Sequence, residues 1–183
     1  MWILYILIGI VAIILLYFAL TYNKFVRLDN RAREAFSTMD IYLKKRWDLV
    51  PNLVETVKGY AKHEKDTLAE VINLRNKSYD KLSVEDKLEA NAEITKNISQ
   101  IMAIAESYPE LKASENFQKL AEQLAKLEDE IANSRKYYNG TVRMFNNALK
   151  MFPSNIVGKM LKYAEKPMFE ASEEDRKSVK VEL

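Results

Sequence analysis

Residues 2–20 read WILYILIGIVAIILLYFAL and contain no charged residue and no Asn, Gln, Ser or Pro. As a helix rising about 1.5 Å per residue, this stretch is about 28 Å long, close to the hydrocarbon thickness of a bilayer. Aromatic side chains, which favour the membrane interface, lie near both ends. The stretch therefore predicts a membrane-spanning helix whose ends are marked by Trp2, Tyr5, Tyr17 and Leu20.

A buried core helix and a cleaved signal peptide are the other interpretations of this stretch. A core helix seldom needs apolar side chains around its whole circumference. A signal peptide has a basic segment before its apolar run and small residues at its cleavage site. Nothing basic precedes Trp2, and Phe18-Ala19-Leu20-Thr21 is a poor cleavage site. We therefore expect an uncleaved anchor over residues 1–22.

The charges that follow the apolar stretch predict its orientation. Basic residues outnumber acidic ones there: Lys24, Arg27, Arg31 and Arg33 against Asp29 and Glu34. A basic flank usually stays on the cytoplasmic side, so we expect a cytoplasmic C-terminal domain. Lys24, Arg27 and Arg31 are the expected contacts to lipid headgroups, each adding about 1 kcal/mol of attraction to an anionic leaflet.

Beyond the anchor, apolar residues recur every three or four positions, which predicts an all-α domain over residues 23–169. We expect long helices over residues 23–49, 51–81, 84–108 and 115–152, a connection over 109–114, and a short amphipathic helix over 156–163. The third helix is expected to bury Val84, Leu88, Ala92, Thr95, Ile98, Ile101, Met102 and Ala105. The fourth helix is expected to bury a stripe from Phe117 to Phe152. An antiparallel four-helix bundle of up-and-down type would bury all four stripes.

Several residues predict the helix boundaries. Pro51 lacks a backbone donor and disfavours helix at the preceding residue, so it either starts a new helix or kinks one long helix. We favour the separate helix. Ser83, followed by an acidic first turn, predicts the N-cap of the third helix, and Ser114 is a candidate N-cap for the fourth. The charged tail over residues 170–183 is expected to be disordered.

The composition argues against several classes of function. The chain has no Cys, which excludes disulfides, iron–sulfur clusters and thiol catalysis. Its 28 basic and 26 acidic residues give a net charge of +2, too balanced to indicate nucleic-acid binding. Zinc-protease and di-iron helix motifs need two His, but only His63 is present. We expect no enzymatic activity, no cofactor and no metal, and we expect the carboxylates to lie on solvated faces.

Two clusters of polar and aromatic residues are candidates for contact with a partner or ligand. The first is Lys45, Arg46 and Trp47, close to Pro51, although a solvated face with one core Trp explains it equally well. The second is Arg135, Tyr137 and Tyr138, followed by Asn146 and Asn147. These polar residues lie within the longest expected helix, where Asn is not preferred. Buried polar residues that fix helix register are the more usual explanation.

Blocks along nearly the whole chain resemble, in matching order, the LemA family. They are YNKFVRLDNR (22–31), LKKRWDLVPNLVETVKGYAKHE (43–64), YPELKASENFQKL (108–120), EIANSRKYYNGTVRMFNNAL (130–149), FPSN (152–155) and Phe169-Glu170. Two departures are Trp47, where a His is expected, and Asp29, where an Arg is expected. The resemblance implies a bacterial cytoplasmic-membrane protein with one N-terminal span and an antiparallel helical bundle, and it implies no particular activity.

Two functions from different classes remain. The first is a membrane-anchored scaffold whose bundle binds other proteins, or further copies of itself, at the bacterial cytoplasmic membrane. The alternative is a membrane-tethered ligand-binding or sensory module that uses the region of Trp47 and Tyr137–Tyr138. An enzyme ranks third, because it would have to work with carboxylates and tyrosines alone.

Overall fold

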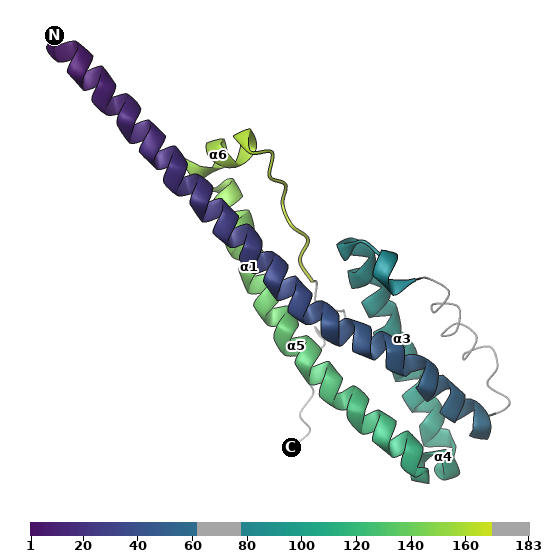
Figure 1. Cartoon of the computed structure of the whole chain (residues 1–183). Helices are drawn as coiled ribbons and strands as arrows, with labels where there is room; N and C mark the ends of the chain where they lie inside the picture. The colour runs from purple at the N-terminus through teal and green to yellow at the C-terminus, as the bar shows by residue number, and fades with distance from the viewer. Residues whose placement is uncertain (62–77, 170–183) are drawn as a thin grey trace, which may run out of the picture. The chain divides into compact units, whose positions relative to one another are not determined.

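The computed structural model describes residues 1–61 and 78–169, and every regular element in these ranges is helical. The elements are α1 (Trp2–Tyr60), the 3₁₀ turn η1 (Tyr79–Lys81), α3 (Val84–Ser107), α4 (Pro109–Ala113), α5 (Glu115–Lys150) and α6 (Ser154–Met160) (Figure 1). The all-α prediction is confirmed for the described residues. Residues 62–77, about half of the helix expected over 51–81, lie outside them, and so do His63 and the tail over 170–183.

The chain divides into two compact units. Unit 1 comprises Met1–Thr38 and Ser134–Met168, and unit 2 comprises Met39–Asn133 and Phe169–Leu183. Helices α1 and α5 therefore each contribute residues to both units. The division into an anchor (1–22), a bundle (23–169) and a tail (170–183) stays a prediction, as does the four-helix arrangement.

Helix α1 continues through Pro51 to Tyr60, so the separate helix expected to begin at Pro51 is wrong. Pro51 leaves the carbonyl of Trp47 without its helical donor. Burial offsets this loss, because one apolar stripe continues on both sides of the proline. The buried residues of this stripe are Leu43, Trp47, Val50, Val54, Val57 and Ala61. Their spacing of three and four residues keeps one face of a single helix against the core of unit 2.

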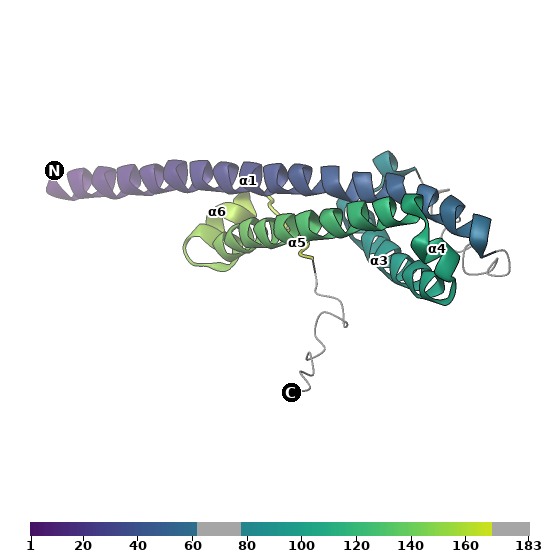
Figure 2. The ribbon, with the colours of Figure 1, turned by 90° about the horizontal axis from the view of Figure 1, so that it is seen from below.

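In unit 1, α1 and α5 run antiparallel and side by side in both ribbon views (Figure 2). Their core contains Phe25 and Leu28 of α1, Phe145 and Ala148 of α5, and Val157 of α6. The ring of Phe25 meets that of Phe145 edge to face, with centroids 6.0 Å apart. Such aromatic pairs favour this geometry and bury much apolar area. They hold the first turns of α1 beyond the apolar stretch against the end of α5.

Helix α6 packs closely on α1, and the segment that follows α6 runs back along α5. A Cβ atom on Gly158 would lie 2.6 Å from Leu149 Cδ2 and 3.1 Å from Phe25 Cζ, so a larger residue there would force these two side chains to shift. The N–H groups of Lys162 and Tyr163 donate to the carbonyls of Lys159 and Gly158, which closes α6 with a Schellman motif. Lys162 adopts the left-handed conformation, φ 56°, that this motif requires.

The extended segment after α6 is held by side chains of α5. The Asn146 amide donates to the carbonyl of Lys166 at 2.9 Å and accepts from the N–H of Lys166 at 2.9 Å. The Tyr138 hydroxyl donates to the carbonyl of Pro167 at 2.9 Å. The short helix expected over 156–163 is present as α6, but it begins two residues earlier and ends three residues earlier than expected. Phe152, expected on the buried stripe, is exposed because α5 ends at Lys150.

Unit 2 confirms the expected start of α3 and corrects its buried face. The Ser83 hydroxyl accepts from the Asp86 N–H and the Asp86 carboxylate accepts from the Ser83 N–H, forming a capping box. The buried residues of α3 are Ala90, Asn91, Ile94, Asn97, Ile101 and Ala105, so most of the expected stripe was wrong. A pattern of apolar residues alone missed the two buried asparagines. The connection expected over 109–114 is the short helix α4, with Pro109 at its first position, where no helical donor is lost.

Candidate functional site

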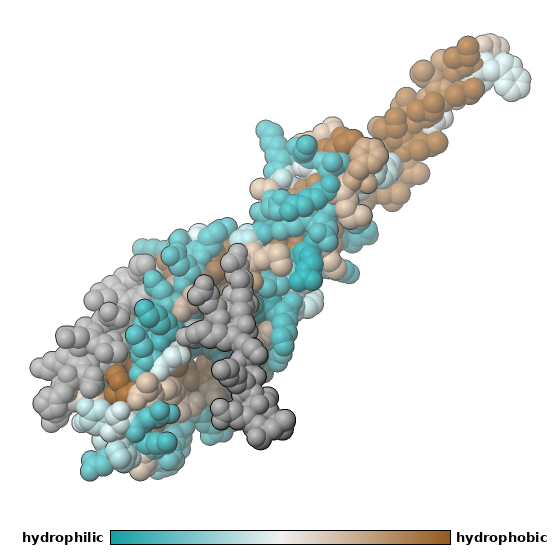
Figure 3. Space-filling model, turned by 180° about the vertical axis from the view of Figure 1, so that it is seen from behind, coloured by the Kyte–Doolittle hydropathy of each residue, from teal (hydrophilic) through white to brown (hydrophobic). Residues whose placement is uncertain are grey.

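The apolar stretch at the start of α1 is exposed in the structure except at Phe18, which is half-buried. Helix α1 contains a window with mean hydropathy 3.0, of which none is buried, long and apolar enough to cross a membrane. Trp2, Tyr5, Tyr17 and Leu20 are all exposed. Figure 3 shows apolar side chains along this stretch on the face seen there. The expected headgroup contacts Lys24, Arg27 and Arg31, on the following turns, are exposed as well.

Arg46 lies inside unit 2, and its surface role in the first candidate cluster is wrong. Its side chain is 1% exposed and pairs with the Glu128 carboxylate of α5 at 2.5 Å. A second guanidinium nitrogen donates to the carbonyl of Asn91 at 3.0 Å and to the Asn91 side-chain oxygen. Arg46 is therefore a buried charge that joins α1 to α3 and α5. It falls on the buried face of α1, between Leu43 and Val50, which explains why it is internal.

Trp47 is also internal, as part of a cluster around Tyr79. The rings of Trp47 and Tyr79 lie with centroids 5.3 Å apart. The Tyr79 hydroxyl donates to Asp40 Oδ1 at 2.6 Å, and Lys87 Nζ donates to Asp40 Oδ2 at 2.7 Å. Burial and the hydrogen bond to the Asp40 carboxylate both raise the pKa of Tyr79 well above its usual range. Tyr79 therefore remains a protonated donor, and its hydrogen bond to Asp40 holds η1 against α1.

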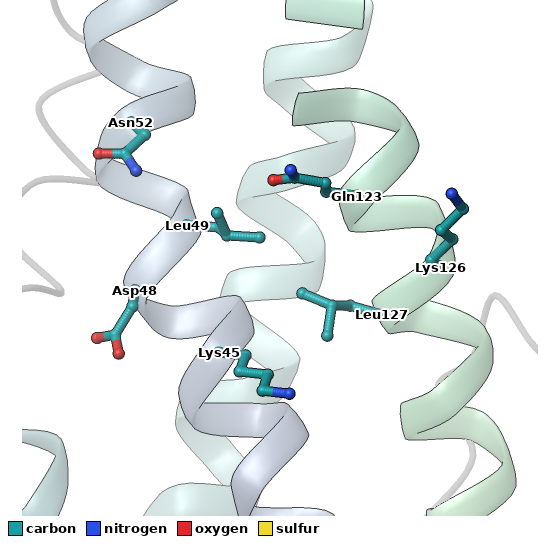
Figure 4. Close-up of a pocket in the computed structure, with 7 residues that line it drawn as sticks. All are labelled: Lys45, Asp48, Leu49, Asn52, Gln123, Lys126 and Leu127. Atoms are coloured by element: carbon teal, nitrogen blue, oxygen red, sulfur yellow. The ribbon is translucent and has the colours of Figure 1, made fainter. Parts of the chain in front are cut away.

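A shallow groove runs between α1 and α5 of unit 2, beside Lys45. It is open to solvent, has a volume of about 480 Å³ and is lined by Lys45, Asp48, Leu49, Asn52, Gln123, Lys126 and Leu127. Figure 4 shows Leu49 and Leu127 pointing toward each other between the two helices, with Gln123 beside them. Two rim charges are already paired within their own helices, Asp48 with Lys44 and Lys126 with Glu122, both at 2.7 Å. The groove thus offers an apolar floor with a mostly neutralised rim.

The second candidate cluster lies in unit 1. Tyr137 is exposed on α5, whereas Tyr138 is buried with its ring 5.7 Å from that of Phe36. Arg135 is half-buried. Tyr138 and Asn146 therefore hold the segment after α6, a role that the sequence did not reveal. Contact with a partner stays an untested prediction for Lys45, Arg135 and Tyr137.

Two carboxylates contradict the expectation that all lie on solvated faces. Asp40 is held by Tyr79 and Lys87, as described above. Asp29 is buried in unit 1 and pairs with Lys166 at 2.7 Å and with Arg33 at 2.8 Å. Burial opposes ionisation of Asp29, but the two cations outweigh it and lower its pKa below the usual 3.8. Asp29 directly follows buried Leu28, and Asp40 directly follows buried Met39. These neighbours are the only feature of the sequence that indicates the burial of the two carboxylates.

The described residues contain no group of three or more His, Asp or Glu side chains arranged to hold a metal ion. The residues that the structure brings together instead form structural contacts: Arg46 with Asn91 and Glu128, and Tyr79 with Asp40. Neither set leaves an accessible nucleophile beside a base. The absence of a cofactor and of enzymatic activity stays a prediction.

These features define an all-helical protein with one apolar N-terminal stretch long enough to cross a membrane. Within that class, a model of the LemA family matches residues 35–183. The match covers most of the chain, and the chain therefore belongs to the LemA family. No curated protein matches it.

Proposed function

We propose that this chain is a scaffold of the bacterial cytoplasmic membrane: a single-pass anchor carries a helical domain in the cytoplasm that binds other proteins and catalyses no reaction. One observation carries the proposal. The apolar stretch, exposed except at half-buried Phe18, continues without a break as α1 into both units. An apolar surface of this kind is stable in lipid and unfavourable in water. Whatever holds the stretch therefore also holds the helical domain.

The arrangement of the helices within each unit supports the remaining parts of the proposal. In unit 1, Phe25 meets Phe145 and Phe36 meets Tyr138, so α1 and α5 run antiparallel. This direction agrees with the up-and-down four-helix bundle expected from the sequence, which we keep as part of the proposal. The basic residues after the apolar stretch support a cytoplasmic domain.

The groove between Leu49 and Leu127 is our candidate for the protein-binding surface. Its apolar floor and paired rim charges suit an apolar side chain or an amphipathic helix of a partner. A photo-crosslinking amino acid at Gln123, on the groove rim, tests this in intact cells. The matched control is Ala125, which is also exposed but lies about 200° further around α5.

We expect a crosslinked product of one or a few discrete masses from Gln123 and none from Ala125. A product of twice the chain mass would identify a second copy as the partner. Equal crosslinking at both positions, or none at either, would overturn the assignment of the groove. The anchor is tested separately by extraction: the chain should stay in the membrane in carbonate or high salt and leave it only in detergent.

A ligand-binding function is the second candidate, and the volume of the groove favours it. About 480 Å³ lies within the range of small-molecule sites, about 300–1,000 Å³. Trp47 is internal and does not line the groove, so the reporter of an occupant is a Trp introduced on the groove rim, Gln123→Trp. In a Trp2→Phe variant, saturable responses to anions, nucleotides or lipids that disappear on Leu127→Glu would favour this function. Responses that Leu127→Glu leaves unchanged, or none at all, would favour the scaffold.

A further inference from the structure

Large apolar side chains project from the region where α5 ends and α6 begins. They are Met151, Phe152, Ile156 and Met160, here called the α6 patch. Phe152 is 79% exposed and Met160 is 66% exposed. Ile156 and Met160 are four residues apart on α6 and so share one face of that helix. Exposed apolar side chains gathered in one short stretch are typical of surfaces that bind a protein or a membrane.

The α6 patch lies in unit 1 close to the end of the apolar stretch. Val157 of α6 shares a core with Phe25, and Phe18 packs against the same core. Phe25 follows Leu20 by five residues, about 7.5 Å along the helix, and Phe18 lies within the apolar stretch itself. The headgroup layer of a bilayer adds about 5–7 Å beyond the hydrocarbon on each side. Helix α6, which lies beside α1 in both ribbon views, is therefore at the depth of the headgroups when residues 2–20 span the membrane (Figures 1 and 2).

The charges around the α6 patch suit an anionic surface. Lys159 and Lys162 are exposed on and just after α6, and no acidic residue occurs between Met151 and Ala164. Apolar side chains flanked by lysines are typical of helices that lie in the membrane interface. A protein partner would leave this one-sided charge and the nearness to the span unexplained.

We propose that the α6 patch is a second membrane contact, in which Phe152, Ile156 and Met160 enter the boundary between headgroups and acyl chains while Lys159 and Lys162 bind anionic headgroups. The inference rests on the proposed anchor and extends it. A single helix can rotate about its own axis in the membrane. A second contact beside the first fixes which side of unit 1 faces the bilayer.

Depth measurements with spin labels test the inference on the full chain, because its lack of Cys permits single labels without background. Phe152→Cys and Met160→Cys report on the patch. Tyr137 is 59% exposed and lies about 20 Å from Phe152 along the axis of α5. Tyr137→Cys is therefore the aqueous control. Leu16→Cys reports on the span. Each variant is reconstituted in vesicles of phosphatidylglycerol and phosphatidylcholine, and its accessibility to oxygen and to a water-soluble nickel chelate is measured.

We expect the labels at 152 and 160 to gain oxygen accessibility and to lose nickel accessibility relative to the label at 137. Changing Lys159 and Lys162 together to Gln should weaken this insertion by about fivefold per lysine removed. In vesicles without the anionic lipid, the same double change should have little effect.

Three other outcomes would overturn the inference, each in a different way. A deep label at 16 with labels at 152 and 160 as aqueous as the label at 137 would leave the anchor in place and remove the second contact. An aqueous label at 16 would remove the anchor itself, and with it the second contact. Labels at 152 and 160 shielded from both reagents, with spin–spin broadening, would show that a second copy of the chain covers the patch.

Discussion

The ion pair between Arg46 and Glu128 joins two side chains that differ sharply in exposure, 1% against 49%. Removing Glu128 should therefore cost a different amount of stability from removing Arg46. Glu128→Ala leaves a guanidinium buried without its carboxylate, and we expect it to destabilise unit 2 by about 3 kcal/mol. Arg46→Met removes the buried charge and leaves Glu128 free to hydrate, but it takes the donor from the buried side-chain oxygen of Asn91, so we expect a smaller loss of about 2 kcal/mol. Urea unfolding in detergent, followed by the fluorescence of buried Trp47, measures both.

Glu122→Ala on the same helix is the matched control for this pair. Glu122 also pairs with a cation, Lys126, but both side chains are exposed. Exposed pairs of this kind contribute little, so the unfolding midpoint should not move. If Glu122→Ala and Glu128→Ala had equal effects, the buried position of Arg46 would not be what matters.

Asp29 gives unit 1 a stability that depends on pH. Its pKa is lowered below 3.8 in the folded chain by Lys166 and Arg33. A depressed pKa means that the stabilisation is complete above the unfolded-state value and is lost as the pH falls through the lower folded-state value. Asp29→Asn should therefore cost about 1 kcal/mol at neutral pH. Thermal unfolding in detergent measures the stability of Asp29→Asn and of the parent chain at neutral pH and at a pH below the unfolded-state pKa. The difference in stability between the two should be smaller at the acidic pH. Glu34→Gln, exposed on the same helix, should leave that difference near zero at both pH values.

Among the elements, α1 carries the clearest test, because Pro51 lies inside a continuous helix. Pro51→Ala restores the donor to the Trp47 carbonyl, and we expect a gain of about 1 kcal/mol after the greater freedom of the unfolded chain is subtracted. Pro109→Ala is the matched control, since Pro109 is at the first position of α4 and displaces no helical donor. A loss of stability in Pro51→Ala would indicate that Pro51 begins a helix. The urea midpoint of each variant decides between these results.

The same helix shows how far the sequence could predict the fold. The spacing from Leu43 to Ala61 is unbroken across Pro51, so the apolar pattern already favoured one helix, while the local preference of proline argued for two. Burial outweighed the local preference. On α3, in contrast, no pattern of apolar residues identifies Asn91 as buried. Its position follows from Arg46, a residue 45 positions earlier that reaches it only in the folded chain. Contacts of this kind, like that between Asn146 and Lys166, depend on distant partners and could not be predicted from local periodicity.

For the whole molecule, the orientation in the membrane decides which partners can reach the groove and which leaflet can meet the α6 patch. The basic residues after the apolar stretch predict that everything beyond it is cytoplasmic. A Cys at exposed Lys96 of α3 reports this in intact cells with a membrane-impermeant maleimide, again without background. We expect labelling only after the membrane is permeabilised, with a cytoplasmic protein and an external protein as controls for the reagent. Labelling in intact cells would reverse the orientation. The lysines of α6 would then face the outer leaflet, and partners of the groove would have to be sought in the cell envelope.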